Sequence, residues 1–98
     1  MLELLTLSDF ETHVGRVFEI DHPDGSRVPL SLTQANALRA YAHPLKTRDP
    51  FDLLFEAPGP LLAQGIYAFE FGADDRREIF IVPIAGNNGT YTYQAIFN

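Results

Sequence analysis

The sequence contains no cysteine and no tryptophan, and only 7 of its 98 residues are lysine or arginine. Without cysteine the chain has no disulfide, no thiolate metal ligand and no cysteine nucleophile. Its 13 acidic residues bring the net charge to -6. Nucleic acids and anionic membranes both bind basic surfaces. We therefore expect neither nucleic-acid binding nor binding to an anionic membrane surface.

Long apolar runs are also missing from the sequence. No stretch approaches the roughly 20 apolar residues that span a bilayer, so we expect no membrane insertion. The opening segment, residues 1–7, has acidic rather than basic flanks, unlike a signal peptide. We therefore expect a cytoplasmic protein, or one exported without a cleaved signal, with incorporation into an assembly left open. The length suits one hydrophobic core, so we predict a single domain over residues 1–98.

One helix signature lies near the N-terminus. Ser8 is the expected N-cap, Glu11 is its capping-box partner three residues later, and Gly15 is placed to end the helix. Phe10 and Val14 stand four residues apart, so we expect them to share the buried face of this helix. The sequence predicts one short helix of about two turns.

From Arg16 onward the apolar residues alternate with polar ones, which is the period of a half-buried strand. Alternating segments separated by turn residues lie at 17–21, 27–33, 51–56, 65–71, 76–84 and 90–97. Six short strands after one short helix predict a mainly β fold. We expect a small antiparallel barrel or rolled sheet with the helix packed over one end. Residues 34–50 are the least regular part. Residues 34–42 have good helix formers but no clear cap; the alternative to a helical turn is an extension of the second strand, followed by a loop with Lys46 and Arg48.

Four strings in the second half of the chain resemble a known family: Phe51-x-Leu-Leu-Phe55, Leu61-Leu-x-Gln-Gly-Ile-Tyr67, Ile79-Phe-x-Val-Pro-Ile84 and Tyr93-Gln-Ala-Ile-Phe-Asn98. Together with the leucine-rich opening, they resemble a small uncharacterised bacterial family of about this length, a β-rich domain of unknown function. The matching positions are mostly apolar residues and turn glycines, which specify a fold and not a chemistry. The resemblance therefore implies no activity, cofactor or site residue.

The residues that carry chemistry form no recognisable catalytic or metal motif. Asp21-His22-x-Asp24 is nearest to a ligand cluster, but its proline and glycine are typical of a solvated turn. Asp52 and Glu56 share one face of the predicted strand at 51–56. Either could form a catalytic carboxylate pair with Glu70 only if the strand at 65–71 lay opposite. A half-exposed strand shows the same alternation. We expect no enzyme, no cofactor and no metal site.

The segment Ile79–Ile84 is apolar at both parities, so both of its faces favour burial. The sequence does not tell which parity faces the core. Apolar residues on other predicted strands extend the second face, which is either covered by the helix and residues 34–50 or in contact with another subunit. The candidate protein interface consists of Leu54, Ile66, Ala68, Phe80, Val82 and Ile96.

By elimination, these features favour a non-enzymatic protein-interaction or structural module. Such a module would form a homo-oligomer or serve as an accessory component of a larger assembly, such as a phage tail. The alternative is a small-ligand-binding β-barrel whose cavity is lined by Tyr67, Phe69, Tyr91 and Tyr93. Six short strands enclose little space, so we expect a filled interior, closed at one mouth by Leu61 and Leu62.

Overall fold

A computed structural model describes residues 5–38 and 50–97 of the chain. It confirms a mainly β fold with one short helix near the N-terminus and six strands. In chain order the elements are α1 (Leu7–Glu11), β1 (Val17–Asp21), β2 (Arg27–Ala37), β3 (Phe51–Pro58), β4 (Gly65–Gly72), β5 (Asp75–Asn87) and β6 (Thr90–Phe97).

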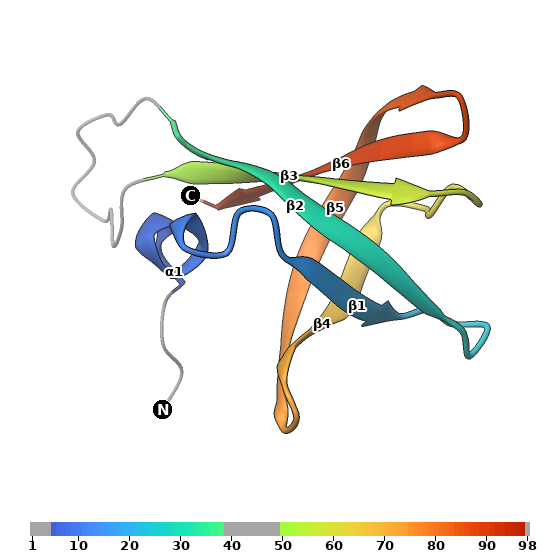
Figure 1. Cartoon of the computed structure of the whole chain (residues 1–98), viewed down its shortest axis with the longest axis horizontal. Helices are drawn as coiled ribbons and strands as arrows, with labels where there is room; N and C mark the ends of the chain where they lie inside the picture. The colour runs from blue at the N-terminus through green and yellow to red at the C-terminus, as the bar shows by residue number, and fades with distance from the viewer. Residues whose placement is uncertain (1–4, 39–49, 98) are drawn as a thin grey trace.

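The strands form a closed antiparallel barrel in the order β1-β2-β3-β6-β5-β4 (Figure 1). The long strand β5 pairs with β4 up to Ile81 and with β6 from Val82 onward, so it joins two sides of the barrel. Between β1 and β4 the described residues share a single pair, Ile20 with Phe69. The barrel therefore closes at a short seam.

Side chains alternate between the inside and the outside of the barrel, because successive residues of a strand point to opposite faces. On β3, Phe51, Leu53 and Phe55 are buried in the interior. Burying a side chain of this size stabilises the fold by about 1.5–3 kcal/mol. On β5, Ile79 and Ile81 point inward, which settles the parity of that strand. The other inward-facing buried residues are Phe18, Ile20, Leu30, Leu32, Ala57, Tyr67, Phe69, Tyr93 and Ala95.

Both ends of the barrel are closed. At one end, α1 inserts Phe10, whose ring centroid lies 5.9 Å from that of Phe51 and 5.8 Å from that of Phe97. The helix therefore packs over one end of the barrel, as predicted. At the other end, Leu62 is buried and its backbone N–H donates to the Tyr93 hydroxyl over 2.9 Å. Leu61 is exposed, so only one of the two leucines closes this mouth.

The helix is shorter than predicted and begins two residues earlier. Its N-cap is Thr6, whose backbone N–H donates to the Asp9 carboxylate over 2.7 Å, so Ser8 lies within the first turn. The prediction that Val14 shares the buried face with Phe10 is wrong. Because the helix ends at Glu11, the four-residue spacing does not hold, and Val14 is exposed.

Strand β2 continues to Ala37, which resolves part of the irregular segment at 34–50. The register between β2 and β3 shifts between Leu32 and Gln34, where the Thr33 hydroxyl donates to the backbone oxygen of Leu54 over 3.1 Å. This bulge interrupts the alternation, so the alternation alone does not reach past residue 33, and the structure confirms the extension of the second strand as far as Ala37. Lys46 and Arg48 lie outside the described residues.

Candidate functional site

The six residues predicted to form an interface all lie on the outward side of the barrel wall. We call them the outer face: Leu54, Ile66, Ala68, Phe80, Val82 and Ile96. Ile66 pairs directly with Phe80 across β4 and β5. The exposed fractions are 64% for Ile66, 50% for Phe80 and 55% for Ile96. Cross-strand neighbours lie within contact distance, so Ile66 and Phe80 form the centre of an exposed apolar surface.

The rest of the outer face follows from the strand register. Val82 on β5 and Leu54 on β3 both pair with Gln94 of β6, which lies between them. Ile96 stands two residues beyond Gln94 on the same side of β6, since side chains alternate along a strand. Leu54, Ala68 and Val82 are half-buried. The outer face therefore extends over four neighbouring strands in the barrel order.

The helix does not cover the outer face. The helix packs at the end of the barrel through Phe10, and the ring of Phe10 also lies 5.9 Å from that of Phe71. Ile66, Phe80 and Ile96 consequently remain at least half exposed in the folded chain. We expected the second apolar side of β5 to be covered within the chain or to contact another subunit. For these three residues, the helix provides no cover.

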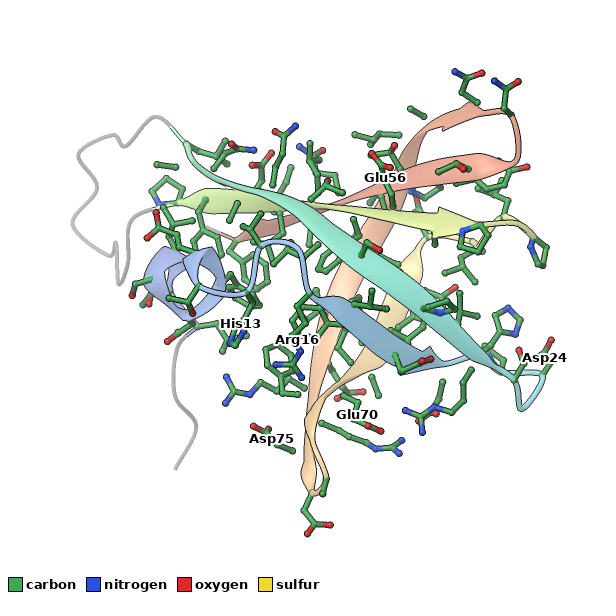
Figure 2. The ribbon with its side chains drawn as sticks, in the orientation of Figure 1. His13, Arg16, Asp24, Glu56, Glu70 and Asp75 are labelled. Carbon is green, nitrogen blue, oxygen red and sulfur yellow. The ribbon has the colours of Figure 1, made fainter. Side chains whose placement is uncertain are left out.

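The carboxylates considered as a catalytic pair do not converge. Asp52 is buried, and its Oδ2 atom accepts a hydrogen bond of 2.8 Å from the Gln94 amide. Glu56 is exposed on β3, and Figure 2 shows it well apart from Glu70 and Asp75. β3 and β4 are not neighbours in the barrel. Within residues 5–38 and 50–97, no three histidine or acidic side chains are grouped closely enough to hold a metal ion.

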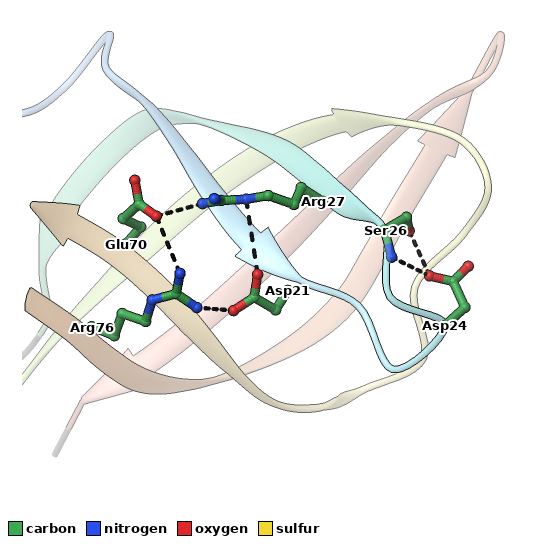
Figure 3. Close-up of polar contacts among 6 residues, drawn as sticks. All are labelled: Asp21, Asp24, Ser26, Arg27, Glu70 and Arg76. Atoms are coloured by element: carbon green, nitrogen blue, oxygen red, sulfur yellow. Dashed lines mark hydrogen bonds and ion pairs between the residues drawn. The ribbon is translucent and has the colours of Figure 1, made fainter. Parts of the chain in front are cut away.

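Glu70 instead belongs to a ring of four charged residues at the β1–β4 seam (Figure 3). Its Oε2 atom lies 2.5 Å from a guanidinium nitrogen of Arg27 and 3.5 Å from one of Arg76. Asp21 forms ion pairs with the same two arginines. The hydrogen bond from Arg27 holds the pKa of the Glu70 carboxyl below its usual range. This ring neutralises its own charges and joins β1, β2, β4 and β5 where backbone pairing is short.

The Asp21-His22-x-Asp24 string lies at a solvated turn. The Asp24 carboxylate accepts hydrogen bonds from the Ser26 hydroxyl over 2.6 Å and from the Ser26 backbone N–H over 2.8 Å. These bonds lower the pKa of Asp24 to about 2. His22 Nδ1 lies 2.9 Å from the same carboxylate. Asp24 therefore stabilises the turn between β1 and β2.

Three of the four aromatic residues considered as cavity lining fill the barrel interior. Tyr67, Phe69 and Tyr93 are buried, and the ring of Phe69 lies 5.1 Å from that of Phe55. The Tyr67 hydroxyl donates to the backbone oxygen of Ala63 over 2.7 Å. Burial raises the pKa of the Tyr93 phenol, which stays neutral and accepts the bond from Leu62. Tyr67, Phe69 and Tyr93 thus belong to the packed core, and the two tyrosine hydroxyls bond to backbone groups of the barrel's own chain.

Comparison with known proteins identifies the family. A family model described as domain of unknown function DUF6916 matches residues 5–97. The chain belongs to this family. No curated protein and no solved structure is significantly similar to the chain. The DUF6916 match thus covers the barrel and its helix. In the described part of the chain, none of the helices has the length and apolar character needed to cross a bilayer.

Proposed function

We propose that the chain is a non-enzymatic protein-interaction module that binds a protein partner through the outer face. The observation that carries this proposal is the paired, exposed Ile66 and Phe80 on the outside of a barrel whose inside is filled. An exposed aromatic and aliphatic cluster in a small domain is typical of a contact surface. Binding through this face would place the domain within a larger assembly.

The energetics of the outer face support this proposal. Phe80 and Ile66 each leave half or more of their side chain in water, so their burial by a partner would release further hydrophobic free energy. Large apolar side chains at the centre of a patch contribute most of the affinity of a protein interface. Leu54 and Val82, which are half-buried, would add shape complementarity around this centre.

The filled interior favours this function over the ligand-binding barrel. Phe18, Phe55 and Phe69 are buried against one another, with ring centroids 5.1 to 6.3 Å apart. Phe10 closes one mouth and Leu62 the other. A ligand inside the barrel would have to displace these side chains, and emptying a packed core costs several kcal/mol.

Site-specific photo-crosslinking tests the proposal and captures a partner of any identity. The photoreactive residue p-benzoylphenylalanine replaces Phe80 in one variant and Val14 in the control, because Val14 is equally exposed and lies beside the helix. Irradiation in the cells that produce the protein should yield a protein adduct from position 80 and none from position 14. An adduct of twice the chain mass identifies a homo-oligomer. Absence of any adduct from position 80 contradicts the proposal.

A further inference from the structure

We infer that the partner of the outer face is a different protein, whose apolar contact residues are flanked by lysine or arginine. The inference rests on the proposed function and names the chemistry of the partner. Its basis is the position of charged side chains around the outer face. Electrostatic complementarity of this kind selects partners and sets their association rates.

Acidic residues stand at opposite corners of the outer face. Glu78 pairs with Ala68 and lies two residues before Phe80 on the same side of β5. Glu56 lies two residues after Leu54 on the same side of β3. Both are exposed. In the described part of the chain, neither takes part in an ion pair. The apolar surface is thus bordered by two carboxylates that are open to an incoming cation.

The four arginines that the structure describes contact other groups. Arg27 and Arg76 bind Asp21 and Glu70 in the ring at the seam. The Arg16 guanidinium donates to the backbone oxygen of Phe71 over 2.8 Å.

The fourth, Arg77, contacts Asp75 over 3.2 Å and stacks over the ring of Phe71. None of these contacts reaches Glu56 or Glu78. Arg76 lies two residues before Glu78 on the same side of β5, but its ion pairs are with Asp21 and Glu70 of the ring. The four described arginines therefore leave Glu56 and Glu78 without an ion pair.

A second copy of the chain fits this surface poorly. In a two-fold contact the same patch meets itself, so one interface would have Glu56 and Glu78 of both copies at its border. Each copy also carries a net charge of -6. Like charges across an interface weaken it, whereas a lysine or arginine opposite each carboxylate strengthens it. The partner is consequently expected to present apolar residues between basic ones.

The test measures the charge dependence of the adduct formed from position 80 in clarified lysate of the producing cells. Raising the sodium chloride concentration from about 50 mM to about 500 mM strengthens the screening of charges and should reduce the adduct yield. Glu78→Gln and Glu56→Gln should each reduce it by up to about fivefold, the upper range for an exposed ion pair. The control Glu11→Gln, an exposed residue of α1, should leave the yield unchanged.

Peptide mapping of the adduct should place lysine or arginine beside the crosslinked apolar residue of the partner. A yield that is insensitive to salt and to both glutamine variants overturns the inference and leaves the proposed function standing. An adduct between two copies of the chain does the same. Loss of every adduct from position 80 contradicts the inference and the proposed function together. Thermal unfolding of each variant confirms that it remains folded.

Discussion

At Gly86 the chain has no room for a side chain. A Cβ atom built there would lie 2.7 Å from Cδ1 and 2.9 Å from Cε1 of the Tyr91 ring, which pairs with Gly86 across β5 and β6. A Cβ atom at Gly59 would lie 3.3 Å from Cε2 of the same ring. The Tyr91 ring thus lies close to two glycines, and a side chain at Gly86 would force the ring to move.

We therefore expect Gly86→Ala to lower the free energy of unfolding by about 1–3 kcal/mol, the usual cost of overpacking. Urea denaturation measures this loss. Gly72→Ala is the matched control, since its Cβ would meet the nearest atom at 3.8 Å, an ordinary contact. Equal stability of the two variants would contradict this account of Gly86. In a Tyr91→Ala background the cost of Gly86→Ala should shrink.

Asp24 gives the prediction for pH dependence. Hydrogen bonds from Ser26 lower its folded-state pKa to about 2, below the ordinary value of 3.8. A carboxyl whose pKa is depressed by folding contributes stability above its unfolded pKa and loses it as the pH falls through the folded pKa. The contribution of Asp24 should therefore disappear between about pH 4 and pH 2.

An NMR titration of the Asp24 carboxyl carbon should show a midpoint near 2 in the native protein. Ser26→Ala removes the hydroxyl donor and should move that midpoint upward, toward the ordinary value. A midpoint near 3.8 for Asp24 in the native protein would show that the turn bonds do not persist in solution.

At the scale of elements, α1 closes the barrel with Phe10 fully buried and Leu7 half-buried against the core. Phe10 is buried among Phe51, Phe71 and Phe97. We expect Phe10→Ala to destabilise the fold by about 3–5 kcal/mol, as for other large aromatic residues removed from a core. Val14→Ala, an exposed control, should change stability by less than about 0.5 kcal/mol. Urea midpoints compare the two, and similar losses would contradict the role assigned to Phe10.

The strands illustrate what can be predicted from sequence. Period-two alternation is sufficient to identify the inward side of β3. There Phe51, Leu53 and Phe55 alternate along the strand with residues that are polar or half-buried. It is not sufficient for Ile79–Ile84, where both parities are apolar and only the register with β4 and β6 decides. The prediction of Ser8 as the N-cap is wrong, because the Asp9 carboxylate accepts a hydrogen bond from the Thr6 backbone N–H and the helix begins after Thr6.

The candidate site depends on the same distinction. All six residues of the outer face follow from alternation once the inward parity is known. Their contact across strands, such as Ile66 with Phe80, requires the register. The charged ring at the seam could not be predicted, because Arg27 and Glu70 are 43 residues apart in sequence and meet only when the barrel closes. Long-range pairing of this kind has no local sequence signal.

At the scale of the whole molecule, the charge distribution predicts the oligomeric state of the isolated protein. With a net charge of -6 and carboxylates beside the outer face, copies of the chain should repel one another. Light scattering across a dilution series should give the mass of one chain, 11.0 kDa, at each concentration. A stable dimer that Phe80→Asp dissociates would assign the outer face to self-association and exclude the basic partner.

Photo-crosslinking from position 80, compared with position 14, tests most directly whether the outer face binds a protein. Both positions are about half exposed, and only Phe80 belongs to the outer face. We predict a discrete adduct from position 80 that Ile66→Asp abolishes, and no adduct from position 14. No adduct from position 80, or equal adducts from the two positions, would contradict the central claim that this face is the interaction surface.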